Sequence, residues 1–496
     1  MLSQAALVAS VVALGWLAAL ALHRAWLLAR FRRVTSRTFA EPAELPAVTV
    51  QLPLYNEPSV AARAIEALAT LDYPTDKLCI QVLDDSNDET RAIVDREAAR
   101  WQASGLQVEV LRREHRAGFK AGALAGAWAR VRTPLIAIFD ADFVPAPTFL
   151  RSLVGAFEEP RVGMVQARWD HLERDASLFS RAQATLLDGH FVITHAVRRS
   201  EGRFTHFNGT AGIWRTDAIG SAGGWEGDTL TEDLDLSYRA QLAGWRFEYA
   251  AHVAVPAELP ATISAFKTQQ RRWSRGTVQA ARKLIPSIWR ARAPFASKLE
   301  ATIHLVTHGA HPAVLSLGLL APHADFDALG HAFAWLVLGV LAVLWFFYER
   351  AEAALGKPTL RRAQDAVLAI LLGAGMSATL SLAALRGLFL GTGSFERTPK
   401  RGSDRARREA PDLELALLVE WLLAAHALLG VWRAVDAGAW TWAVLLAVYA
   451  LGFGWVGTLA LSVALERRMR SDPSQTCART STGTASSSSR STATAR

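Results

Sequence analysis

Two aspartates follow an apolar run of the chain and stand two residues apart. The segment LIAIFDADFVP places Asp140 and Asp142 where a β-strand would end. Alternate residues of an extended chain point to the same side, so both carboxylates can face one divalent cation. Hard oxygen ligands favour Mg²⁺ or Mn²⁺ bound to a diphosphate. The pair therefore indicates a metal and diphosphate site, and a solvated strand end is the structural alternative.

Two further acidic groups have types and positions that suit chemistry. In QVLDDSNDET, Asp84 and Asp85 follow another apolar run, where carboxylates can accept hydrogen bonds from a ribose or a base. In GDTLTEDLDLSYRA, Thr231, Glu232 and Asp233 stand at a predicted helix start. A carboxylate there can act as general base on an acceptor hydroxyl that attacks a sugar carbon. Helix capping by Thr231, with acidic residues favoured by the dipole, is the alternative.

A fourth segment, KTQQRRWSRG, contains Gln269, Arg272 and Trp273. A guanidinium can neutralise a departing diphosphate through paired hydrogen bonds. An indole can stack on the apolar face of a pyranose ring. Core packing of Trp273 and a surface ion pair of Arg272 are the structural alternatives.

These residues lie in a stretch of soluble composition, from about residue 45 to 290. Short β-like runs alternate there with helical patterns such as SVAARAIEALATL and FKAGALAGAWARV; the runs are AVTVQLPL, CIQVLDDS, VEVLRRE and LIAIFDAD. The alternation predicts a parallel α/β sheet. Open sheets of this kind bind ligands at the carboxyl edge of the strands, so Asn56 and the aspartates are expected to gather there.

Apolar segments flank this stretch. Only 20% of the 496 residues are charged, and they avoid several long runs, which is typical of an integral membrane protein. Lys and Arg on both sides of 365–390 predict that this segment lies at the interface as a helix and does not cross. Five spans then place the N-terminus outside the inner or plasma membrane, with the catalytic domain and the C-terminus in the cytosol. The predicted spans are 5–23, 303–322, 329–348, 413–433 and 440–465.

The predicted organisation follows from these segments. It comprises an N-terminal anchor (1–30), a cytosolic α/β domain (40–295), two spans (300–350), an interface helix (365–390), a loop (391–410), two further spans (413–466) and a disordered tail (471–496). Two cysteines, Cys79 and Cys477, cannot build a disulfide framework. The net charge of +8 is placed where the positive-inside rule expects it, so no nucleic-acid partner is predicted. His304, His308 and His311 predict a polar helix face rather than a metal site, because no acid or cysteine accompanies them.

The order of D, DxD, TED and QxxRW resembles the signature of processive family 2 glycosyltransferases of the cellulose synthase superfamily. Finer similarity over residues 47–290 resembles the plant cellulose-synthase-like A and C proteins, which make mannan and β-1,4-glucan backbones. Bacterial cellulose synthase catalytic subunits are a more distant match, since this chain has one predicted N-terminal span and no C-terminal cyclic-di-GMP-binding domain. The similar segments are QLPLYNE, QVLDDS, GFKAGAL, FDADFVP, VQARW, FNGTAGIWR, AGGW and QQRRW.

The resemblance implies a GT-A fold, a mostly parallel sheet flanked by helices and inserted between transmembrane helices, with inverting transfer from a nucleotide sugar. Asp84 or Asp85 would hold the nucleoside. Lys120 would approach the donor phosphates, Asp140 the diphosphate and Asp142 the metal, Mg²⁺ or Mn²⁺. It also implies Asp233 as the base and Arg272 as the group that stabilises the leaving diphosphate. The implied acceptor-binding residues are Gln269, Trp273, Glu232, Asn208, Gly209 and Thr210.

The segment FERTPK resembles a gating loop of cellulose synthases, with Phe395, Thr398 and Lys400 at matching positions and Arg397 in place of valine. Such a loop would exclude water when the donor binds. A basic juxtamembrane loop held by anionic lipids is the alternative.

The sequence thus predicts an enzyme that adds hexose from UDP-glucose or GDP-mannose to a β-1,4-linked polysaccharide and moves the chain across the bilayer, with export partner subunits left open. A glycolipid-forming transferase with a lipid acceptor is the first alternative. A transporter or scaffold with a relic fold is the second, and the acidic residues together with Arg272 argue against it.

Overall fold

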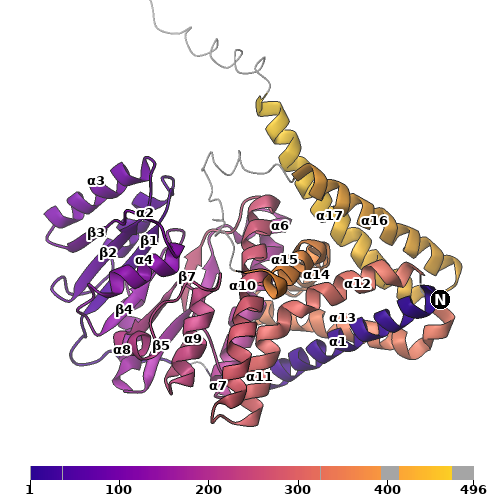
Figure 1. Cartoon of the computed structure of the whole chain (residues 1–496), viewed down its shortest axis with the longest axis horizontal. Coiled ribbons are helices and arrows are strands. Elements are labelled where there is room, and N and C mark those ends of the chain that lie inside the picture. Colours follow the sequence, from indigo (N-terminus) through magenta and orange to yellow (C-terminus); the bar gives the residue numbers. More distant parts are fainter. Residues whose placement is uncertain (1, 36, 324–325, 392–412, 472–496) are drawn as a thin grey trace, which may run out of the picture.

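The computed structural model describes residues 2–35, 37–323, 326–391 and 413–471 (Figure 1). The predicted gating-loop residues Phe395, Thr398 and Lys400, and the tail after residue 471, lie outside the described residues. The sheet with its helices forms one side of the molecule in Figure 1, and the long apolar helices form the other.

One mixed sheet of seven strands forms the α/β part, in the order β3-β2-β1-β4-β6-β5-β7. The four predicted β-like runs are β1 to β4. Only β6 runs antiparallel to its two neighbours among these strands, so the predicted parallel sheet is correct for the other six. The strands are β1 (Val48–Leu54), β2 (Leu78–Asp84), β3 (Gln107–Leu111), β4 (Leu135–Ile138), β5 (Val162–His171), β6 (Gly212–Arg215) and β7 (Arg246–Ala257).

Both faces of the sheet are covered by helices, which explains why its central strands are apolar at nearly every position. Along β4, Leu135 and Ala137 belong to one buried cluster, while Ile136 and Ile138 belong to another on the opposite face. The helices of this part are α2 (Ala61–Ala69), α3 (Thr90–Ala103), α4 (Phe119–Trp128), α5 (Phe149–Val154), α8 (Thr216–Ser221) and α9 (Glu232–Leu242). With both faces covered, the side of the sheet that remains available to bind ligands is the one where the carboxyl ends of the strands lie.

Helices after β5 and β7 connect the sheet to the apolar helices. They are α6 (Leu178–Asp188), the π-helical segment η3 (Gly189–His195), α7 (Ala196–Ser200) and α10 (Ile263–Arg290). Buried ion pairs tie them to the membrane-type helices: Arg174 contacts both Asp188 and Glu352, and Lys267 pairs with Glu420. Because breaking a buried pair strands a charge, these contacts fix the sheet against the helices.

Within the described part of the chain, four helices are long and apolar enough to cross a membrane, or five if one bent pair counts as a span, as expected of an integral membrane protein. The four are Leu7–Phe31, Phe295–His323, Leu418–Asp436 and Trp440–Glu466. The predicted span 329–348 lies in α13 and is not among them; the first side chains of α13 lie outside the described set. The helices of this part are α1 (Leu2–Phe31), α11 (Phe295–Val306), α12 (Ala310–Leu320), α13 (Phe326–Ala354), α14 (Thr359–Gly375), α15 (Ser377–Phe389), α16 (Leu413–Asp436) and α17 (Trp440–Ser471).

Segment 365–390 differs from the single helix expected at the interface. It forms α14 and α15, which are bent by 55° relative to each other and together are apolar enough for a broken span or a re-entrant pair. Gly375 ends α14 directly against the backbone of Gly452 in α17. Small residues allow helices to approach this closely, and the charge pattern of the segment does not report such a contact.

Candidate active site

A cavity of about 160 Å³ opens at the carboxyl edge of β1, β2 and β4. The sheet topology brings the strand ends together here, and α9 and α10 close the other side. The predicted residues that line this cavity are Asp85, Lys120, Asp140, Asp142, Asn208, Gly209, Glu232, Asp233, Gln269, Arg272 and Trp273. Residues that the sequence separates by more than 180 positions thus meet at one edge of the sheet.

Lys120, in the first turn of α4, holds two parts of the cavity wall together. Its Nζ donates to Asp140 Oδ1 at 2.5 Å and to the carbonyl of Gly209 at 2.8 Å. Thr210 Oγ1 accepts a hydrogen bond from the backbone N–H of Asp140 at 2.9 Å. Burial opposes the charge on Lys120, but the carboxylates of Asp140 and Glu232 raise its pKa above the usual value. The FNGTAG loop is therefore pinned to the exit of β4.

Asp233 lies in the first turn of α9. Thr231 occupies the N-cap position, as the sequence predicts, but its hydroxyl makes no capping hydrogen bond. Burial, and next the neighbouring Glu232, raise the pKa of Asp233 to about 7, against the opposing effects of the Leu234 N–H, Lys120 and Arg272. A buried carboxyl with a pKa near neutrality is suited to accept a proton.

The DxD pair differs in exposure. The side chain of Asp140 is 37% exposed, whereas Asp142 is buried at 6% exposure. Both lie directly after β4 and face the same cavity. The donor set available at this edge consists of carboxylate oxygens, which fits Mg²⁺ or Mn²⁺ better than a soft cation.

Asp84 and Asp85 do not share one environment. Asp84 is fully buried, accepts from Arg112 Nε at 2.8 Å and from the Ser86 N–H at 3.0 Å, and does not line the cavity. Asp85 lines it and accepts from Arg113 Nε at 3.0 Å. Of the two alternatives for nucleoside binding, the geometry favours Asp85.

Two aromatic residues of the wall were not identified as site residues from the sequence. Tyr55 follows β1, and the guanidinium carbon of Arg116 lies 3.5 Å from the centroid of its ring. Trp169, in β5, stacks on Phe191 at 4.8 Å between ring centroids and lies 6.4 Å from Trp273. Tyr55 and Trp169 stand in QLPLYNE and VQARW, two of the segments that carry the family resemblance. The resemblance could therefore have pointed to them, but it implied no role for either residue.

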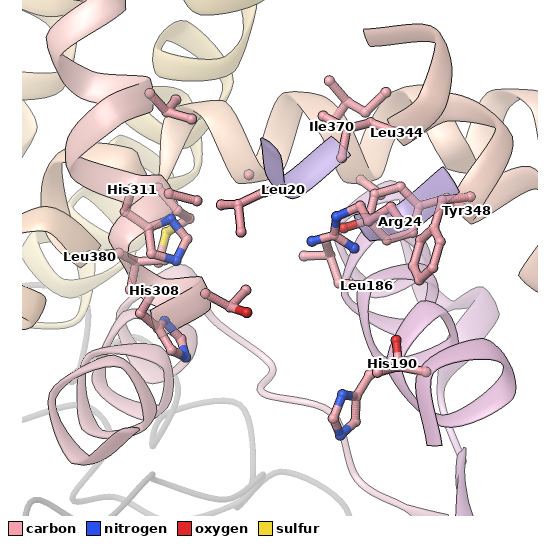
Figure 2. Close-up of a pocket in the computed structure, with 18 of the residues that line it drawn as sticks. Leu20, Arg24, Leu186, His190, His308, His311, Leu344, Tyr348, Ile370 and Leu380 are labelled. Carbon is pink, nitrogen blue, oxygen red and sulfur yellow. The ribbon is translucent and has the colours of Figure 1, made fainter. Parts of the chain in front are cut away.

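A larger cavity of about 490 Å³ continues from the site into the apolar helices (Figure 2). It shares Trp169, Asn208, Asp233 and Trp273 with the smaller cavity. Its wall includes residues of α1, α12, α13, α14 and α17. His304, His308 and His311 line it, so the polar helix face predicted for this segment is confirmed in position.

Comparison with known proteins supports the same chemistry. A family model described as "Glycosyltransferase like family 2" matches residues 46–276, which contain every named residue of the smaller cavity. Glucomannan 4-beta-mannosyltransferase 2 of Arabidopsis thaliana is 37% identical over 372 residues, which cover 68% of this chain and 69% of the relative. Glucomannan 4-beta-mannosyltransferase 1 of Oryza sativa subsp. japonica is 43% identical over 250 residues, which cover 49% of this chain and 48% of the relative. The chain thus spans about two thirds of one relative and half of the other.

Among solved structures, the chain is similar to the mannosyltransferase PcManGT from Pyrobaculum calidifontis, determined in complex with GDP-Man and Mn²⁺. The TM-score is 0.52 at 22% identity, and the match covers 78% of this chain and 99% of that one. At this identity the likeness supports the GT-A fold.

Proposed function

The chain belongs to the cellulose-synthase-like glycosyltransferases that include the glucomannan 4-β-mannosyltransferases, and we propose that it transfers mannose from GDP-mannose to a β-1,4-linked polysaccharide. The observation that carries the proposal is the buried carboxyl of Asp233, which shares one cavity with Lys120 and Arg272. The names of the relatives favour GDP-mannose over UDP-glucose, the two donors that the sequence leaves open.

In this mechanism Asp233 removes the proton from an acceptor hydroxyl. The oxygen attacks C1 of the donor sugar, the bond from C1 to the diphosphate oxygen breaks, and the configuration inverts. A pKa near 7 makes Asp233 a competent base at neutral pH. Arg272 and Lys120 stabilise the charge that develops on the leaving diphosphate, because fixed cations in a water-poor cavity act strongly there.

The residues of the DxD pair fit a divalent cation. Asp142 would hold it, with Asp140 beside it. When bound, the cation neutralises diphosphate charge. Asp85 and Tyr55 would orient the nucleoside at the far end of the cavity, since both line the wall next to β1 and β2.

The acceptor would approach from the larger cavity. Gln269 and Trp273 are one turn apart on α10 and face the site, so the indole is placed for stacking on a terminal sugar. Asn208, Gly209 and Glu232 line the same cavity and would contact the acceptor, as the resemblance implies. Thr210 does not line the cavity; it is buried and accepts a hydrogen bond from the Asp140 N–H. Continuity of the two cavities supports movement of the growing chain between the apolar helices.

The test uses membranes that contain this protein, supplied separately with labelled GDP-mannose and UDP-glucose. The product is divided into ethanol-insoluble polymer and organic-soluble lipid, and the polymer is digested with linkage-specific β-mannanase and cellulase. Mannanase-sensitive polymer from GDP-mannose is expected. Label confined to the lipid fraction would replace this proposal with a glycolipid transferase, and cellulase-sensitive polymer from UDP-glucose would replace the donor.

A further inference from the structure

Three histidines form a cluster beside the proposed acceptor site. His190 is the second and His195 the last residue of the π-helical segment η3, and His206 lies between α7 and β6. Their ring centroids are 4.6 Å apart for His190 and His195, 4.8 Å for His195 and His206, and 5.3 Å for His190 and His206. One ring nitrogen of each lies within 4.8 Å of the others.

Two of these rings face a common point. The amide nitrogen of Asn208 lies 3.1 Å from Nε2 of His190 and 3.1 Å from Nε2 of His206. The amide thus marks the place on which the two imidazoles converge. Figure 2 shows His190 directed into the larger cavity.

The cluster also contains polar atoms that lack hydrogen-bonding partners among the described residues. Nδ1 of His206 is buried in this state, and the two buried ring nitrogens of His195 have one polar neighbour between them, the side chain of Asn208. Buried polar atoms are nearly always satisfied in native proteins, so this concentration requires an explanation. A sugar in the larger cavity cannot supply it for His195, because His190 and His206 line that cavity and His195 does not.

We propose that His190, His195 and His206 bind a zinc ion. Three imidazole nitrogens are a ligand set that Zn²⁺ prefers, and they are poor ligands for the Mg²⁺ or Mn²⁺ expected at the DxD carboxylates. Zn–N bonds of about 2.1 Å bring tetrahedral ligands to roughly 3.4 Å from one another. The rings therefore close inward by side-chain rotation, and the amide of Asn208 turns or gives way.

The three imidazoles are in the neutral form that binds a metal ion. Burial lowers the pKa of each of the three histidines, to about 3 for His190, so the imidazoles are neutral and keep a lone pair for a metal. The buried Arg198 close by is paired with Glu300 at 3.0 Å. Its charge still adds to the lowering of the pKa of all three histidines.

The position suggests what the ion would do. Asn208 precedes Gly209, whose carbonyl accepts from Lys120 and whose α-carbon faces Asp233. A zinc ion at the cluster would fix this loop from the side opposite Lys120. The ion is a positioning element for the acceptor wall and takes no part in bond cleavage.

The test measures metal directly and does not depend on the proposed transferase activity. The full chain is purified without an affinity tag in detergent, and zinc is measured by elemental analysis. The protein is then stripped with a chelator, titrated with Co²⁺ and followed by visible absorption, and its melting temperature is recorded with and without Zn²⁺. About one zinc per chain, a cobalt spectrum of nitrogen ligation and a zinc-dependent rise in melting temperature are expected.

Matched variants assign the ligands. His195→Gln and His206→Gln are each expected to weaken zinc binding at least tenfold, because each removes one of the three ligands. His115→Gln changes an exposed histidine, and Asp142→Asn changes the DxD site; both are expected to retain zinc. Equal zinc content in all variants would overturn the assignment. Absence of zinc, cobalt spectrum and thermal shift in the unmodified protein would overturn the site itself, without any variant having to fold.

Discussion

Gly209 packs its α-carbon directly against the carboxylate of Asp233. A Cβ at position 209 would lie 3.0 Å from Asp233 Oδ2, and the backbone there has φ +83°, a conformation that side chains disfavour. In the FNGTAG loop the backbone of Gly209 therefore contacts the proposed base directly, with no side chain between them.

This contact predicts that Gly209→Ala slows transfer by about tenfold or more, because displacement of Asp233 misaligns the reacting groups. Gly202→Ala is the matched control: its φ is +64°, so it carries similar backbone strain, but its Cβ would meet open space. Initial rates of polymer formation and melting temperatures of both variants provide the check. Equal rate losses in the two would attribute the effect to strain alone.

The pH dependence of transfer follows from Asp233. Since burial and the neighbouring Glu232 together raise its pKa to about 7, the rate should fall as the pH drops below about 7, where the base becomes protonated. Glu232 contributes to this raised pKa, so Glu232→Gln should move the acidic limb of the profile to lower pH. Rates from about pH 5 to 9 at saturating donor measure this limb. An unchanged limb in Glu232→Gln would mean that another group titrates.

Substitution of Asp84 and of Asp85 should have different effects on stability and on donor binding. Asp84→Asn removes the charge from a partly buried pair with Arg112, which keeps Asp95 as a second partner, and is expected to cost about 2 kcal/mol of unfolding free energy. Asp85→Asn should instead raise the KM for the donor about tenfold with a smaller loss of stability, because Asp85 lines the cavity. Thermal unfolding together with donor kinetics distinguishes the two. A raised KM for the donor in Asp84→Asn, with little change in Asp85→Asn, would place the nucleoside at Asp84.

Metal removal should stop transfer reversibly. Treatment of membranes with EDTA is expected to abolish polymer formation, and Mn²⁺ or Mg²⁺ should restore it. In Asp142→Asn the concentration of metal needed for half of the maximal rate should increase by about tenfold or more. Full activity in EDTA would remove the divalent cation from the mechanism.

Much of the site was accessible from the sequence because parallel strands end at one edge. Once β1 to β4 were identified from apolar runs, Asp85, Asp140 and Asp142 had to lie near one another. Motif order then added Asp233 and Arg272. The sequence does not show which of Asp84 and Asp85 faces the cavity. That choice is linked to their partners Arg112 and Arg113, which directly follow β3 and lie 28 positions along the chain.

Other features depended on packing between distant segments. Gly375, at the bend between α14 and α15, packs against Gly452 of α17, and the histidine cluster forms where the π-helical segment η3 approaches the loop before β6. Periodicity along one segment does not report such contacts. The antiparallel direction of β6 is likewise set by its neighbours, β4 and β5.

The account depends most on the role of Asp233 in mannosyl transfer. The decisive measurement compares unmodified protein with Asp233→Asn, recording both incorporation of mannose from labelled GDP-mannose and equilibrium binding of GDP-mannose. Loss of incorporation by about a thousandfold with donor affinity nearly unchanged is predicted, as for removal of a general base. Incorporation by Asp233→Asn at a rate near that of the unmodified protein would contradict the account.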